Sequence, residues 1–252
     1  MANRRILVTG SSRGIGRAVA QAFATAGDVV AIHHRDSADL AAEVLDSLPG
    51  YGHVVVQADI ADPQAVRAMV DSAAGQLGGL DVLVNNAASY GRSAHPVSEV
   101  SYEQWQQVWR DTIDLNLIGA ANVTWCAVRH MIAGGGGRIV NVSSRGAFRG
   151  EPGQPAYGAS KAGLNALGQS LAVALAPHNI TVAGVAPGFV ETDMAAAHLA
   201  GPSGAAIRAQ SPFGRVARPE EIAAAVVFLA SPEAEWASGA ILDLNGASYL
   251  RT

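Results

Sequence analysis

The stretch Thr9-Gly10-Ser11-Ser12-Arg13-Gly14-Ile15-Gly16 decides the fold, because it joins a short apolar run to a segment with helical apolar spacing. Its three glycines permit a tight turn, a close approach of the backbone to a pyrophosphate, and close packing of the helix on the strand. The amino terminus of the helix then faces the anion. No Gly-Lys-Ser/Thr ending follows, which rejects a nucleoside-triphosphate loop. An ordinary glycine-rich turn is the simpler alternative, but the order of strand, loop and helix favours a dinucleotide site.

Seven short runs rich in β-branched residues alternate with longer Ala-rich segments. The runs predict strands at Ile6–Val8, Val29–Ile32, Val54–Val56, Val82–Val84, Ile139–Val142, Ile180–Val185 and Ile241–Leu244. The longer segments predict helices at Ile15–Ala26, Ala38–Leu48, Pro63–Leu77, Tyr102–Ala133, Tyr157–Ala176 and Pro219–Ala230. Strands without polar alternation, separated by helices, are typical of a parallel sheet covered on both faces. We therefore expect an α/β protein with a doubly wound, seven-stranded parallel sheet of the Rossmann type.

No internal repeat and no change of composition marks a domain boundary, so we expect residues 1–252 to form a single dinucleotide-binding and catalytic domain. The segment 187–219 differs from the rest because it is rich in Ala, Gly and Pro and shows no strand pattern. It is predicted to be a lid over the substrate.

The composition narrows the class of partner. The 17 Lys and Arg residues are interspersed with 21 Asp and Glu residues, so no basic stripe is available and a nucleic-acid partner is not expected. No apolar run approaches the roughly 18 to 20 residues of a membrane helix, and the start lacks a signal segment. We expect a soluble cytoplasmic protein without a membrane partner. A single cysteine, Cys126, favours neither a disulfide nor a metal site.

The second predicted strand bears on the choice of nucleotide. A site for a 2′-hydroxyl usually places an acid at the end of this strand, whereas a 2′-phosphate requires cations. Here the strand ends in His33-His34-Arg35, and Asp36 comes later. Arg13 and Arg35 are able to flank a 2′-phosphate, unless both are simply solvated. The sequence therefore favours NADP(H), with NAD(H) as the alternative.

A second group of residues has the chemistry of a proton-transfer site. Tyr157 and Lys161 are four residues apart at the start of a predicted helix, so they share one face. Ser144 lies 13 residues earlier, just after a strand, and Asn116 lies in the long helix before that strand. With Thr9–Gly16 and Asn85-Asn86-Ala87, these residues resemble the short-chain dehydrogenase/reductase family. Pro187–Met194 and Asn245-Gly246 are most similar to its 3-oxoacyl-carrier-protein reductase branch.

The resemblance implies a role for each catalytic candidate. Tyr157 would exchange a proton with the substrate oxygen, although the free pKa of a phenol, about 10, must be lowered for this role. Lys161 and the cationic nicotinamide of the oxidised cofactor would favour the phenolate. Ser144 would hydrogen-bond the substrate oxygen, and its spacing to Tyr157 favours it over Ser143. By resemblance, Lys161 also holds the nicotinamide ribose, and Asn116 orders a water that relays protons to Lys161.

The resemblance also implies a set of cofactor contacts that follow the carboxyl ends of different strands, where ligands of open α/β sheets bind. The glycine loop and the second strand would supply Gly10, Ser12, Arg13, Gly14, Ile15, Gly16, His34 and Arg35. Asp59 and Ile60 would contact the adenine, Asn86 and Ala87 would belong to the loop over the cofactor, and Pro187, Gly188, Val190 and Thr192 would lie near the nicotinamide, beside Tyr157 and Lys161. For Asp59, a helix cap ahead of Pro63 is the alternative.

Two departures from the family pattern matter. Ala88 stands where the family usually has glycine, which costs little if its φ is negative. The turns Gly134–Gly137 and Pro177-His178-Asn179 lack the basic residues that dock an acidic carrier protein, which weakens that interpretation. Three other arginines either replace these carrier-protein contacts or are simply solvated: Arg92, Arg145 and Arg149.

We therefore expect hydride transfer between NADP(H) and a ketone or secondary alcohol, with 3-oxoacyl thioesters as one candidate substrate class. An NAD(P)-dependent dehydrogenase of sugars or small alcohols, a non-catalytic cofactor sensor and a methyltransferase are the alternatives. Residues 162, 166, 170 and 174 form a stripe of small side chains, which serves packing within the subunit or between subunits. The family resemblance favours the second use, in a homotetramer.

Overall fold

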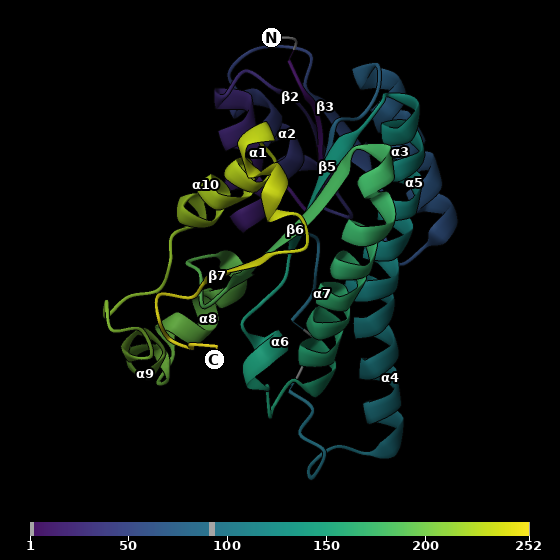
Figure 1. Ribbon diagram of the computed structural model, residues 1–252. Helices are drawn as coiled ribbons and strands as arrows, with labels where there is room; N and C mark the ends of the chain where they lie inside the picture. The colour runs from purple at the N-terminus through teal and green to yellow at the C-terminus, as the bar shows by residue number, and fades with distance from the viewer. Residues whose placement is uncertain (1–2, 91–93, 252) are drawn as a thin grey trace.

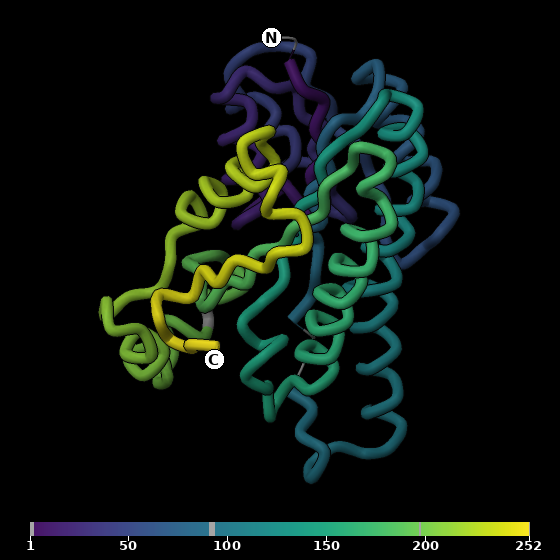
Figure 2. The backbone as a smooth tube through the Cα atoms, in the orientation of Figure 1, coloured from purple at the N-terminus to yellow at the C-terminus, as the bar shows by residue number. Residues whose placement is uncertain are grey.

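The computed structural model describes residues 3–90 and 94–251, so Arg92 lies outside the described residues (Figures 1 and 2). One sheet of seven parallel strands has the order β3-β2-β1-β4-β5-β6-β7. The strands are β1 (Arg5–Val8), β2 (Val29–His34), β3 (Val54–Gln57), β4 (Val82–Asn85), β5 (Gly137–Val142), β6 (Ile180–Pro187) and β7 (Ile241–Leu244). The predicted fold class is confirmed.

Helices cover both faces of this sheet (Figure 1). The α-helices of the described residues are α1 (Gly14–Thr25), α2 (Ala38–Ser47), α3 (Pro63–Leu77), α4 (Tyr102–Ile113), α5 (Ala120–Ala133), α6 (Gly146–Arg149), α7 (Pro155–Leu175), α8 (Asp193–Ala200), α9 (Gly204–Ala209) and α10 (Pro219–Leu229). Helices α1, α2 and α10 cover one face, and α3, α5 and α7 cover the other.

The strand β1 shows why the sequence lacks polar alternation. Ile6 and Val8 pack in the core beneath α1 and α10, whereas Leu7 points to the opposite core beneath α3 and α5. All three side chains are fully buried. Because successive side chains of a strand point to opposite faces, a strand covered on both faces has no position left for a polar side chain.

The order of the strands fixes the place of a ligand. The chain reverses its direction of travel through the sheet between β1 and β4, which are neighbours. The loops that follow these two strands therefore diverge at the carboxyl edge and leave a crevice, the usual ligand site of such sheets. The glycine loop after β1 and Asn86 after β4 both lie there.

The long helix predicted over residues 102–133 is interrupted. A π-helical turn, Asp114–Gly119, separates α4 from α5 and contains Asn116. Such turns insert one extra residue and occur often at functional sites. The sequence pattern missed this turn because a single extra residue changes the apolar spacing very little.

The predicted lid contains two short helices, α8 and α9, that the sequence pattern also missed. Its two ends are joined to each other by a bridge between Val190 and Ala217, just before α10 begins. Figure 2 shows the C-terminal segment beside these lid helices, where the Ser211 hydroxyl donates to the Gly246 carbonyl at 2.6 Å. Within the described ranges, no helix is long and apolar enough to cross a membrane.

Candidate active site

The glycine loop has the backbone that its sequence predicts. Gly10 and Gly14 have φ angles of 64° and 55°, which L side chains rarely adopt. A Cβ on Gly10 would lie 2.9 Å from the Cα of Ala87, and a Cβ on Gly16 would overlap the Gly10 carbonyl oxygen. Arg13, the N-cap of α1, makes no capping hydrogen bond through its side chain. The start of α1 therefore lacks a side-chain cap in a loop too tight for side chains, which suits a pyrophosphate.

A buried histidine that the sequence analysis placed only at a strand end supports this loop. The Gly10 N–H donates to His33 Nδ1 at 2.8 Å, and His33 Nε2 donates to the Ala58 carbonyl at 3.1 Å. The Ser11 N–H donates to the His33 carbonyl, and the His33 N–H donates to the Ser11 hydroxyl. Burial lowers the pKa of His33 to about 4, so the imidazole is neutral and its Nδ1 is free to accept. The one sign of this role in the sequence is a histidine at the end of an otherwise apolar strand.

The loop after β4 is locked to the glycine loop. The Thr9 hydroxyl accepts hydrogen bonds from the Asn86 and Ala87 main-chain N–H groups, both at 3.0 Å. Asn86 Nδ2 donates to the Thr9 and Gly10 carbonyls. Among the described non-glycine residues, positive φ occurs at Asn179 and Ala247 alone, so Ala88 is not strained. The departure from the family pattern at Ala88 is therefore tolerated by the backbone.

The end of the crevice that is expected to hold the adenosine combines, in the described part of the chain, an unpaired histidine nitrogen with one paired and one unpaired arginine. His34 Nδ1 at the end of β2 is buried and has no hydrogen-bond partner among the described residues. Arg35 forms an ion pair with Asp36, so part of its charge is neutralised, whereas Arg13 is exposed and makes no ion pair with the described residues. Asp62, rather than Asp59, caps α3. The capping alternative for Asp59 is therefore wrong.

The end of the crevice that is expected to hold the nicotinamide is bounded by the start of the predicted lid. A Cβ on Gly14 would meet the Thr192 methyl group at 3.3 Å, so the lid reaches the glycine loop. The Gly188 N–H donates to the Leu244 carbonyl, and the Arg145 N–H donates to the Pro187 carbonyl. Val190 is buried beside these residues. The structure thus gathers the residues expected at this end, Pro187, Gly188, Val190 and Thr192, along one edge of the crevice.

The catalytic candidates meet beside this edge. The Ser144 hydroxyl hydrogen-bonds the Tyr157 hydroxyl, while the Ser143 hydroxyl donates to the Lys161 carbonyl at 3.3 Å. The preference for Ser144 over Ser143 agrees with this geometry. Lys161 is buried, donates from Nζ to the Val142 carbonyl at 2.8 Å, and lies 5.8 Å from the centroid of the Tyr157 ring.

The pKa of Tyr157 is shifted in the direction opposite to the one that its expected catalytic role requires. Burial raises the pKa of Tyr157 to about 12 even though the hydrogen bond from Ser144 lowers it. Burial also lowers the pKa of Lys161 to about 8. The chain's own groups therefore do not acidify the phenol, because the cost of burying the phenolate exceeds the stabilisation that they provide.

Asn116 in the π-helical turn acts as a clamp. Its Oδ1 accepts from the Ser89 N–H at 2.8 Å and its Nδ2 donates to the Ser89 carbonyl at 2.9 Å and to the Ser160 hydroxyl at 3.1 Å. Ser160 in turn donates to the Tyr157 carbonyl. Asn116 thereby joins the loop after β4 to the helix that carries Tyr157, through hydrogen bonds of its side chain.

Comparison with known proteins identifies the family. A family model described as Enoyl-(Acyl carrier protein) reductase matches residues 10–246. The chain is 41% identical over 247 residues to a cis-4-hydroxycyclohexanecarboxylate dehydrogenase of Sinomonas cyclohexanicum, covering 97% of this chain and 96% of that one. The chain belongs to the short-chain dehydrogenase/reductase family. Members of this family are oxidoreductases acting on CH–OH and C=O groups, and this chain is one.

Two further members support the assignment. The 3-oxoacyl-[acyl-carrier-protein] reductase FabG of Staphylococcus aureus strain Mu50 is 38% identical over 246 residues, covering 97% of both chains. The crystal structure of a short-chain dehydrogenase from Burkholderia cenocepacia J2315 in complex with NADP superposes with a TM-score of 0.88 and 36% identity, covering 97% of both chains. Relatives with different substrates are thus about equally similar to this short-chain dehydrogenase/reductase.

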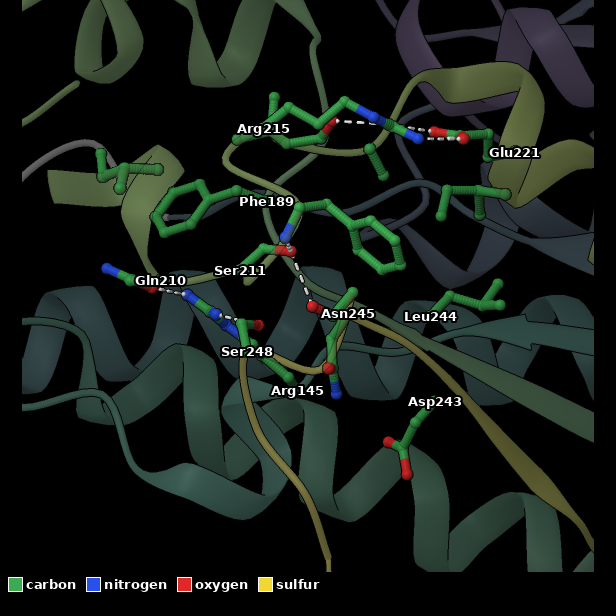
Figure 3. A pocket seen from close by; sticks show the side chains of 16 residues that line it. Arg145, Phe189, Gln210, Ser211, Arg215, Glu221, Asp243, Leu244, Asn245 and Ser248 are labelled. Atoms are coloured by element: carbon green, nitrogen blue, oxygen red, sulfur yellow. Dashed lines mark hydrogen bonds and ion pairs between the residues drawn. The ribbon is translucent and has the colours of Figure 1, made fainter. Parts of the chain in front are cut away.

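This short-chain dehydrogenase/reductase also has a cavity of about 330 Å³ that includes Arg145, the residue after the catalytic candidate Ser144 (Figure 3). It lies between the lid, the start of α10 and the end of β7, and is lined by residues that include Arg145, Phe189, Gln210, Glu221, Asn245 and Ser248. Ser144, Tyr157 and Lys161 do not line it. Arg145, which does line the cavity, follows Ser144 directly in the chain.

Proposed function

We propose that this chain is an NADP(H)-dependent oxidoreductase that interconverts a ketone and a secondary alcohol. The observation that carries the proposal is the meeting of Ser144, Tyr157 and Lys161 at the carboxyl edge of the sheet, next to a glycine loop shaped for a pyrophosphate. A relative of known structure that is described in complex with NADP supports the choice of nucleotide.

Four parts of the chain bind the cofactor. The start of α1 and the glycine loop hold the pyrophosphate, and Arg13 with Arg35 faces the 2′-phosphate. Asp59 and Ile60 contact the adenine, and residues 187–192 hold the nicotinamide. When bound, the cofactor supplies or accepts the hydride at the substrate carbon. The segment 187–219 serves as a lid on a single domain.

Tyr157 moves the proton. In reduction its hydroxyl donates the proton to the substrate oxygen, and in oxidation the phenolate takes the proton from the alcohol. Ser144 hydrogen-bonds the same oxygen and stabilises the negative charge that develops there. Lys161, still cationic at neutral pH, and the oxidised nicotinamide both favour the phenolate. Asn116 holds Ser89 and Ser160 so that Tyr157 and Lys161 keep their positions; the relay water expected at Asn116 is part of this proposal.

The test is a tyrosine variant with a matched control. Tyr157→Phe removes the transferable proton and leaves the ring, so we expect turnover to fall by about 10²- to 10⁴-fold. The affinity for NADPH, measured by fluorescence titration, should change little. Tyr51→Phe, at a side chain that is 89% exposed, should behave as the unaltered protein. Retained activity in Tyr157→Phe would refute the proposed role.

The preference for NADPH is tested at Arg13. Arg13→Met removes a cation from the glycine loop, and we expect the Kd for NADPH to rise about tenfold while that for NADH is unchanged, since only NADPH has the 2′-phosphate. Arg17→Met, at an exposed arginine one turn later in α1, is the control. An equal effect on both nucleotides would contradict the assignment.

The substrate class separates two versions of this function. Similarity to FabG favours a 3-oxoacyl thioester, and similarity to the hydroxycyclohexanecarboxylate dehydrogenase favours a small cyclic hydroxy acid. Rates of NADPH oxidation with acetoacetyl-coenzyme A and with 4-oxocyclohexanecarboxylate would decide between them.

Assembly into a homotetramer is part of the proposal. The small residues of α7 are exposed, which removes packing within the subunit as their explanation: Ala162, Ala166, Ser170 and Ala174. Val173 on the same helix is 80% exposed, an unusual place for valine on a free surface. We expect Ala166→Arg to reduce the mass measured by light scattering, while the unaltered chain has the mass of four copies. A monomeric mass for the unaltered chain would refute the tetramer.

A further inference from the structure

Arg145 is a buried cation at the junction of the catalytic group and the cavity. Its main-chain N–H donates to the Pro187 carbonyl at 2.9 Å, which fixes the residue against the end of β6. The residue is 4% exposed, and its side chain lines the cavity of about 330 Å³ (Figure 3). The Cα atoms of Arg145 and Ser144 are about 3.8 Å apart, as for any neighbouring residues. Arg145 is thus the residue through which the cavity and Ser144 adjoin each other along the chain.

The charge of Arg145 has no carboxylate partner among the described residues. Its two terminal nitrogens donate to neutral oxygens, those of the Ser248 hydroxyl and the Gln210 side-chain amide, and its guanidinium lies 5.1 Å from the centroid of the Phe189 ring. Glu151 acts on Arg145 at longer range and hydrogen-bonds the Tyr90 hydroxyl. A buried arginine is usually paired, because burying a lone charge is costly.

The other charged groups around the cavity do have partners. Arg215 forms a two-pronged ion pair with Glu221, and Asp243 pairs with Arg251. Their charges cancel, so the cavity retains the positive charge of Arg145. Burial lowers the pKa of Arg145, and Arg149, exposed at the end of α6, lowers it further and adds to this positive field. An anion entering the cavity would therefore meet an uncompensated charge.

We propose that Arg145 receives a carboxylate carried by the substrate, so that the enzyme acts on compact keto acids and hydroxy acids. The inference rests on the proposed function and names its substrate class. A guanidinium presents two parallel donors that match the two oxygens of a carboxylate. A cavity of about 330 Å³ is at the small end of ligand pockets, which suits a ring-sized acid better than a long acyl chain. Ser144 and Tyr157 would hold the reacting oxygen while Arg145 holds the acid group.

Binding without turnover provides the first test. Calorimetry on the full chain compares cyclohexanecarboxylate with cyclohexanecarboxamide, which has nearly the same shape and no charge. We expect the acid to bind about 10- to 100-fold more tightly than the amide, the range of a charge-assisted hydrogen bond. Arg145→Gln should abolish this preference, and Arg149→Gln, at the exposed arginine that also contacts Gln210, should retain it. Equal binding of acid and amide, or no acid binding, overturns the proposal.

Turnover separates this proposal from the proposed function. We expect 4-oxocyclohexanecarboxylate to have a kcat/KM about 10- to 100-fold above that of its amide, with the difference lost in Arg145→Gln. If both ketones are reduced equally by the unaltered enzyme, the oxidoreductase function stands and the arginine receptor is wrong. If the acid binds selectively and neither ketone is reduced, the receptor stands and the proposed function is wrong.

Two further outcomes have fixed meanings. Displacement of the acid by an equal concentration of inorganic phosphate would assign the cavity to a phosphate-bearing ligand and overturn the carboxylate. If Arg145→Gln does not fold, as judged by circular dichroism, Arg145→Lys replaces it, and we expect this variant to retain a reduced preference because the charge remains and the fork is lost. The comparison of acid with amide on the unaltered enzyme decides the proposal in either case.

Discussion

Protonation of His33 should loosen the glycine loop. The imidazole is 2% exposed, accepts the Gly10 N–H at Nδ1, and has its pKa lowered by burial from 6.5 to about 4. Because the unfolded chain binds this proton at higher pH, stability due to His33 is complete above pH 6.5 and is lost as the pH falls toward 4. The difference between the two pKa values corresponds to about 3 kcal/mol of unfolding free energy.

The assay is urea unfolding at pH 7.0, 5.5 and 4.5, on the unaltered protein and on His33→Asn, which does not titrate in this range. We expect the unaltered protein to lose about 2 to 3 kcal/mol more than the variant between the first and last pH. Affinity for NADPH should fall only as the pH approaches 4, where His33 of the folded protein takes up the proton and Nδ1 no longer accepts the Gly10 N–H. His178→Asn, at an exposed histidine, is the matched substitution. Parallel pH profiles of the unaltered protein and His33→Asn would refute the reasoning.

Two other predictions follow from close packing and from burial. Gly16→Ala places a methyl group on the Gly10 carbonyl oxygen, so we expect a loss of about 1 to 3 kcal/mol and weaker NADPH binding, whereas Gly75→Ala, in a helix with nothing nearby, should raise stability by about 1 kcal/mol; thermal unfolding of both variants checks this. The pKa of Lys161 is lowered to about 8, so the folded protein releases this proton first and stability should rise between pH 8 and 10, a rise that Lys161→Met should remove in urea titrations. Above pH 10 the raised pKa of Tyr157 opposes the rise.

The sequence was sufficient for those features that depend on local pattern. Apolar runs predicted every strand of the sheet, and the glycines at 10, 14 and 16 predicted a loop that the structure builds with two positive φ angles. The spacing of Tyr157 and Lys161 predicted a shared helical face, and Lys161 does lie near the Tyr157 ring. In each case the signal lies within a few residues of the feature that it predicts.

Features that depend on distant parts of the chain could not be predicted in this way. The role of His33 depends on Gly10 and Ala58, which lie in the segments that follow β1 and β3. The isolation of Arg145 depends on which carboxylates fold away from it, and no pattern around residue 145 encodes that. The direction of the pKa shift of Tyr157 was also beyond the sequence, because burial, a property of the whole fold, exceeds the effect of its neighbours.

The π-helical turn at Asp114–Gly119 makes the second half of the molecule sensitive to chain length. The turn holds one residue more than a regular α-helical turn, so deleting one residue would close it and change the direction of the side chains within it by up to about 100°, the angle per residue of an α-helix. Asn116 would then leave Ser89 and Ser160, although every residue of the candidate active site would still be present. Two chains with the same catalytic residues can thus differ in activity through a single-residue gap in an alignment.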